Sequence, residues 1–161
     1  EVKSAVFASV GCLVGMLAVH EANKFAYEKY EYKVGCPPSG PLACLLFCMP
    51  TAPASQPKTV IISHAIAVLS ALCAVAVHDF IPVLDVPKPV VGLVLSILAM
   101  KLAKSINPPA AAYAAALSGS GTTFGAVLTG PGTLGAVVLI VVQQVYFKIT
   151  DALSGTKAKK A

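Results

Sequence analysis

The sequence predicts an all-α integral membrane protein with about four membrane-spanning helices and two shorter helices. The first observation is composition: of 161 residues, 57% are hydrophobic and 12% are charged, whereas soluble domains average about 25% charged residues. The second is a set of uncharged stretches near the length of about 20 residues that a helical crossing needs. The third is a Pro-Pro pair that occurs twice, each time before an apolar segment too short to cross. Lipid is therefore the expected solvent of most of the chain.

Four stretches are expected to be membrane-spanning helices, and we expect residues 1–161 to form a single membrane domain. The spans cover about residues 4–20, 59–78, 89–106 and 133–147. Small residues predict where helices pack closely: Gly11 and Gly15 in the first span, and Ala67, Ala71 and Ala74 in the second. Residues 21–33 alternate acids, lysines and tyrosines, as expected of a helix that continues into water.

Two shorter helices are predicted over about residues 38–49 and 108–117. Pro37 and Pro38 precede the first, and Pro108 and Pro109 begin the second. Proline is favoured in the first helical turn because its missing N–H would have no intrahelical partner there. Each short helix lies between two spans, so the order of elements predicts a weak internal repeat. Short helices at matching places in two halves are typical of a membrane binding site.

The starts of the two short helices form the candidate anion-binding site. Helix N-termini attract anions because their N–H groups are free and carry about half a positive charge. All 12 basic residues are lysine, so no arginine is present to clamp an anion. We expect the two ends to meet, with Ser39, Gly40, Asn107, Ala110 and Ala111 as candidate contacts. For Asn107 the sequence leaves a second role open, as the cap of its helix.

His64 and Gln56 are further candidates for this site. His64 lies inside the second span, where a polar residue is a functional candidate by default, but a hydrogen bond to a neighbouring carbonyl would account for it equally. Gln56 ends a proline-rich segment and is a candidate for lining the cavity. Four crossings would place six of the 12 lysines at each face, so lysine distribution predicts no orientation.

Other kinds of site have little support in the sequence. The five cysteines are expected to be free thiols, and no metal site is predicted because too few ligands converge. We expect no enzyme activity, since the spans lack paired acids and the chain lacks a P-loop or a dinucleotide fingerprint. Scattered lysines do not favour nucleic-acid binding. The sequence leaves the question of a cofactor open.

The same motifs resemble the HPP family of integral membrane proteins, named for a His-Pro-Pro motif. The family pattern HPPAGA is similar to residues 107–112, with Asn107 in place of the His and Ala111 in place of the Gly. A second family stretch, of the type LLF followed by P and PxAQP(R/K), is similar to residues 45–58. The resemblance covers roughly residues 35–150.

The resemblance implies a four-span membrane protein, and some plastid and cyanobacterial members of the family are associated with nitrite transport. It favours a small-anion transporter or channel in an organellar membrane, with the chloroplast thylakoid as the first candidate. The alternative is a non-transporting accessory subunit of a larger photosynthetic or respiratory complex, which the altered motif and small-residue helix faces would suit. Besides the lipid bilayer, the expected partners are other subunits of such a complex or further copies of the chain.

Overall fold

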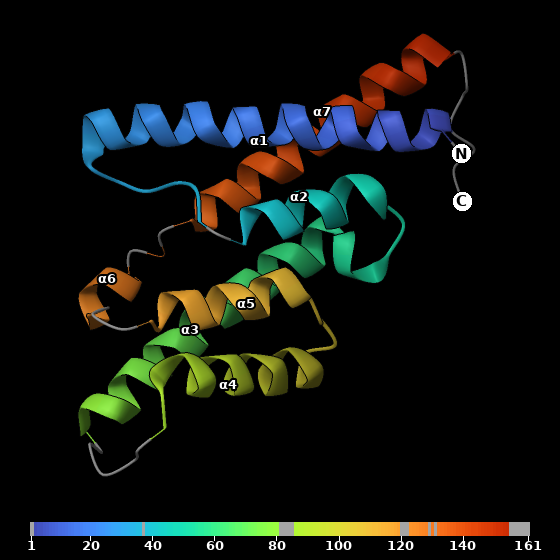
Figure 1. The fold of residues 1–161 in the computed structure, drawn as a ribbon. Helices are drawn as coiled ribbons and strands as arrows, with labels where there is room; N and C mark the ends of the chain where they lie inside the picture. Colours follow the sequence, from blue (N-terminus) through green and yellow to red (C-terminus); the bar gives the residue numbers. More distant parts are fainter. Residues whose placement is uncertain are drawn as a thin grey trace.

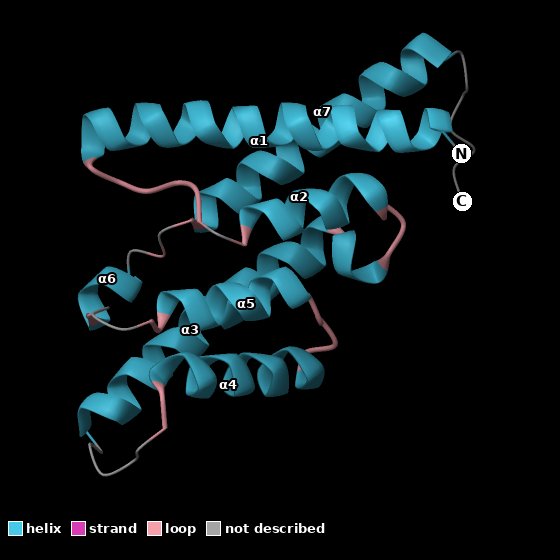
Figure 2. Ribbon diagram, in the orientation of Figure 1, coloured by secondary structure: helices cyan, strands magenta, loops and turns pink. Residues whose placement is uncertain are grey.

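The computed structural model describes residues 2–36, 38–80, 86–119, 123–128, 130 and 132–154. Within these ranges every regular element is helical (Figure 2), which confirms the predicted all-α class. The elements are α1 (Val2–Tyr30), α2 (Ser39–Cys48), the 3₁₀ turn η1 (Pro53–Ser55), α3 (Pro57–Phe80), α4 (Lys88–Leu102), α5 (Pro108–Leu117), α6 (Phe124–Leu128) and α7 (Thr133–Ser154). Helix α5 has the predicted range, α2 is one residue shorter at each end, and α6 was not predicted.

Among the described residues, three helices are long and apolar enough to cross a bilayer: α1, α3 and α7. Their outward faces carry large apolar side chains that are more than half exposed, such as Leu13, Leu17 and Leu69. Such faces are stable against lipid, so the protein is an integral membrane protein. Helix α1 continues through the charged segment as far as Tyr30, as predicted. Helix α4 has only 15 residues and ends before the predicted boundary at residue 106.

The helices run in alternating directions (Figure 1). Viewed as in Figure 1, α1, α3 and α5 run from right to left, whereas α2, α4 and α7 run from left to right. The long helices pack in two pairs, α1 with α7 and α3 with α4. Each short helix packs on two long ones: α2 on α1 and α7, and α5 on α3 and α4. The short helices therefore lie in the interior of the bundle, between the long ones.

Two clusters of buried apolar side chains hold these groups of helices together. One surrounds Tyr113 of α5, where Ala67 and Ala71 of α3 are completely buried. The other surrounds Phe47 of α2, between α1 and α7. A methyl group built on Gly15 would lie 2.9 Å from Cε2 of Phe47, and one on Gly11 would overlap the same ring. The small residues thus allow the close packing that the sequence predicts, and a ring of α2 fills the space beside α1.

Candidate functional site

The start of α2 is fixed between α1 and α7 by the loop that precedes it. Asn23 of α1 accepts hydrogen bonds at Oδ1 from the backbone N–H of Val34 at 2.9 Å and of Gly35 at 3.1 Å. On the opposite side of the loop, the N–H of Gly132 donates to the carbonyl oxygen of Lys33 at 2.9 Å. This asparagine lies in the charged segment, and the pattern of that segment does not indicate this role. The loop cannot move without breaking contacts to both helices.

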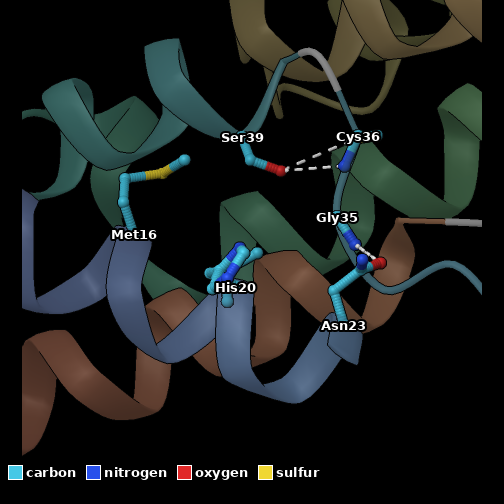
Figure 3. A pocket seen from close by; sticks show the side chains of 7 residues that line it. Met16, His20, Asn23, Gly35, Cys36 and Ser39 are labelled. Carbon is cyan, nitrogen blue, oxygen red and sulfur yellow. Dashed lines mark hydrogen bonds between the residues drawn. The ribbon is translucent and has the colours of Figure 1, made fainter. Parts of the chain in front are cut away.

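A cavity of about 350 Å³ lies beside this start (Figure 3). It is lined by Met16, Val19, His20, Asn23, Gly35, Cys36 and Ser39. In Figure 3, His20 and Met16 of α1 lie across from Ser39 and Cys36. The Ser39 hydroxyl accepts a hydrogen bond from the N–H of Cys36 at 3.3 Å. Burial raises the pKa of the Cys36 thiol, an effect that the contact with Ser39 reduces.

The other predicted residues at this helix lie differently. Pro37 is outside the described residues, and Pro38 stands just before the first helical residue without providing a side-chain cap. Gly40 is exposed, and a methyl group built on it would have no atom within 4 Å. Of the predicted contacts on α2, the structure therefore places Ser39 at the cavity and leaves Gly40 away from it.

Asn107 at the start of α5 is a completely buried cap. Its Oδ1 accepts the N–H of Ala110 at 2.9 Å, and its Nδ2 donates to the carbonyl oxygen of Ala54 at 2.8 Å. Pro108 and Pro109 occupy the first helical turn. Ala110 and Ala111 are buried in the apolar cluster around Tyr113. Asn107 thus has the capping role that the sequence left open, and its side-chain amide is occupied at both ends.

The two N-termini do not face a common point, contrary to the expectation from the sequence. The start of α2 lies near the middle of α5, since Cys36 packs against the cluster that contains Tyr113. The start of α5 lies beside η1, which Ser55 joins to the C-terminal end of α2 through a bond to the Leu45 carbonyl oxygen at 3.1 Å. The short helices overlap side by side in opposite directions (Figure 1), so each start has its own surroundings.

His64 belongs to a buried polar chain between three helices. Its Nδ1 lies 2.8 Å from the carbonyl oxygen of Val60, and its ring centroid is 5.5 Å from that of Tyr113. The Tyr113 hydroxyl in turn lies 3.0 Å from Oγ1 of Thr133. His64 therefore makes the contact with a neighbouring carbonyl that the sequence left open as the alternative to a functional role. Through Tyr113 it is also connected to Thr133, the first residue of α7.

Gln56 is not among the residues that line the cavity beside the start of α2. The side chain is exposed, and its Nε2 donates to the carbonyl oxygens of Pro50 at 3.3 Å and Ala52 at 3.5 Å. It therefore closes the turn between α2 and α3. Another glutamine is the buried one: Gln143 of α7 donates from Nε2 to the Leu46 carbonyl oxygen at 2.8 Å. This hydrogen bond fixes the C-terminal end of α2 to α7.

A second cavity, of about 480 Å³, lies beside the start of α5 and was missed by the sequence reasoning. It is lined by Pro53, Thr59, Lys101, Lys104 and Ile106. In the sequence both lysines lie near the end of the span predicted over residues 89–106. Their convergence with Pro53 depends on how the turn before α3 folds against the end of α4. In the described part of the chain, no group of three His, Cys, Asp or Glu side chains is placed to hold a metal ion.

The comparisons with known proteins agree with the architecture. A family model described as the HPP transmembrane region matches residues 1–154. No characterised protein and no solved structure matches the chain. The match covers all of the described helices, including both short helices with their Pro-Pro starts. The chain belongs to the HPP family of transmembrane proteins.

Proposed function

We propose that the chain is a small-anion transporter or channel made of two halves with opposite orientations in the membrane. The halves are α1-α2-α3 and α4-α5-α7. Corresponding helices run in opposite directions (Figure 1), and each short helix packs on the first helix of its own half and the last helix of the other. A half-turn about an axis in the membrane plane would relate two such halves. Inverted repeats with interrupted helices are common in secondary transporters.

In this proposal the four spans are α1, α3, α4 and α7. With its 15 residues, α4 is about 22 Å long at 1.5 Å per residue, which is shorter than a hydrocarbon core of about 30 Å. The exposed side chains of Lys101 and Lys104 at its end are long enough to bring their charges to the interface. Residues 103–107 then return the chain toward the interior, where α5 begins.

The observation that carries the proposal is the pair of cavities beside the starts of the two short helices. The first presents the hydroxyl of Ser39 together with His20 and Asn23, and the second presents the ammonium groups of Lys101 and Lys104. Among the residues that the structure describes, no acidic side chain lines either cavity. Hydrogen-bond donors and positive charge without carboxylates suit a small oxyanion such as nitrite. The anion would cross the membrane chemically unchanged.

Nitrite uptake into proteoliposomes tests this function. We expect saturable uptake well above that of protein-free vesicles. Ser39→Ala should reduce it several-fold, because the cavity beside α2 loses its hydroxyl. Ser70→Ala on α3 is the matched control: it removes a buried hydroxyl that lines neither of these two cavities, so uptake should not change. Folded protein without anion flux would contradict the proposal. Migration with a larger complex after gentle extraction would then favour an accessory subunit.

The helix directions also predict how the protein is oriented. One face, at the right of Figure 1, holds the starts of α1 and α3 and the ends of α2, α4 and α7. Its lysines are Lys3, Lys58, Lys101, Lys104 and Lys148, and Lys157, Lys159 and Lys160 follow α7 in the sequence. The other face has Lys24, Lys29, Lys33 and Lys88. In this proposal the lysines are therefore not divided evenly, because α2 carries the chain across to the opposite face.

The lysine-rich face should lie on the side from which the chain is inserted, since positive residues are retained there. In a cysteine-free background expressed in bacteria, Glu28→Cys should react with a membrane-impermeant maleimide in intact spheroplasts. Lys58→Cys should react only after the membrane is permeabilised. The reverse labelling pattern would refute this orientation, and labelling of both sites in intact cells would refute the direction assigned to α2.

A further inference from the structure

The cavity at the end of α4 is lined by two positively charged side chains. Lys101 and Lys104 are both exposed and line the same 480 Å³ space. Within the described ranges, no acidic residue forms an ion pair with either ammonium group. Thr59, in the first turn of α3, lines the cavity as well, and the first N–H groups of a helix have no intrahelical partner. The cavity is therefore positive in net charge and rich in donors.

Lys104 occupies a position where glycine is the usual residue. Its φ is 52°, in the left-handed region that side chains with a Cβ disfavour. The N–H of Ser105 donates to the Met100 carbonyl oxygen at 2.9 Å, and that of Lys104 donates to the Lys101 carbonyl oxygen at 3.2 Å. These two bonds define the Schellman motif, whose left-handed residue is most often glycine. A lysine here is strained, and such strain is concentrated at functional sites.

Ser105 adds an unused hydrogen-bonding group beside the cavity. It is 3% exposed, and its Oγ is buried without a hydrogen-bond partner. It stands between Lys104 and Ile106, which both line the cavity. Buried polar side chains nearly always have a partner, so the orphaned hydroxyl makes this segment unusual, but Ser105 does not line the cavity and the polar contacts to a ligand there come from the two lysines.

The corresponding end of α1 shows that the charge is not a requirement of the turn. There Glu31 has a φ of 54°, and its N–H donates to the Tyr27 carbonyl oxygen at 3.0 Å. The first helix of each half is thus followed by one residue with a strained backbone: the acidic Glu31 after α1 and the basic Lys104 after α4. The backbone geometry is satisfied by either charge, so the lysine at the end of α4 needs another explanation.

We propose that this cavity binds an oxyanion at the membrane surface, with the phosphate group of an anionic phospholipid as its occupant. Two ammonium groups match the charge and the acceptor oxygens of a phosphodiester. Pro53 and Ile106 supply apolar contacts for the glycerol and the first acyl carbons. The cavity lies at the lysine-rich face, where basic pockets between helices bind anionic head groups. This cavity is also one of the two on which the proposed transport rests, but lipid binding is measured without anion flux, so each proposal can fail while the other holds.

Native mass spectrometry of the detergent-solubilised full chain tests the site with phosphatidylglycerol and with phosphatidylcholine. We expect phosphatidylglycerol to bind in clear excess and about a fivefold loss of affinity for each of Lys101→Gln and Lys104→Gln. Equal binding of the two lipids, or unchanged binding by the double variant, would overturn the proposal. Inorganic phosphate serves as the second probe. If phosphate binds through these lysines and the lipid does not, the oxyanion site holds and its occupant is a free anion.

A pair of glycine variants separates binding from folding. Lys104→Gly removes the strain, so its midpoint of thermal unfolding should rise while phosphatidylglycerol affinity falls about fivefold. Glu31→Gly is the matched control, because it relieves the same backbone strain at the other face: its midpoint should rise and its lipid affinity should stay unchanged. A loss of lipid binding in Glu31→Gly as large as in Lys104→Gly would show that the effect is not local to the cavity.

Discussion

Replacing Asn107 with alanine is expected to lower the free energy of unfolding by about 2–4 kcal/mol. A lost N-cap costs about 0.5–2 kcal/mol, and a buried carbonyl left without its partner costs about 1–3 kcal/mol. The asparagine supplies both interactions from a completely buried position, to the N–H of Ala110 and to the carbonyl oxygen of Ala54. Helical circular dichroism in mild detergent, followed against temperature or denaturant, measures the loss.

Two further variants divide this loss between the cap and the bridge. Asn107→Asp keeps the acceptor for Ala110 but turns a carboxylate oxygen toward the Ala54 carbonyl oxygen, so the bridge is lost and repulsion is added. Asn107→His introduces the residue of the family motif. Its ring offers one donor and one acceptor nitrogen, so it should destabilise less than alanine does. An alanine variant as stable as the original would show that neither interaction contributes to the fold.

The sequence predicts elements whose causes are local. Pro108 and Pro109 define the start of α5, and the serine that follows Leu117 ends it, so the predicted and observed ranges coincide. The small faces of α1 and α3 were also predictable, because spacing alone puts Gly11 near Gly15 and Ala67 near Ala71. Local pattern was insufficient for α4. Its end depends on Lys104 taking a left-handed conformation, which lysine rarely does.

The candidate site depends on contacts that no local pattern contains. The Nδ2 of Asn107 reaches the carbonyl oxygen of Ala54, 53 residues away in the sequence. The backbone N–H of Gly132 likewise donates to the carbonyl oxygen of Lys33, which is distant in the sequence. Because of such long-range hydrogen bonds, the starts of α2 and α5 do not face a common point. They also bring Pro53 beside Lys104 and so create the second cavity. Helix starts can be predicted from prolines, but their mutual placement follows from the packing of four long helices.

Gly132→Ala is expected to have an effect of similar size, a loss of about 3 kcal/mol or more. Gly132 has a φ of 91°, where a residue with a Cβ is strained by about 1–2 kcal/mol. A methyl group there would lie 2.6 Å from Cβ and 2.7 Å from Sγ of Cys36, and overpacking of this kind costs about 1–3 kcal/mol. The N–H of Gly132 also donates to Lys33, so the strain falls on the contact that fixes the start of α2.

The two causes can be separated at the same position. In Gly132→Ala with Cys36→Gly, the clash is removed and the strained φ remains, so about half of the lost stability should return. Gly40→Ala is the control, since a methyl group there meets no atom within 4 Å and alanine favours helix over glycine by about 0.5–1 kcal/mol; it should stabilise slightly. If the double variant recovers nothing, the strained φ at position 132 accounts for the whole loss. If it recovers everything, the clash with Cys36 accounts for the whole loss and the loop tolerates a Cβ at this φ.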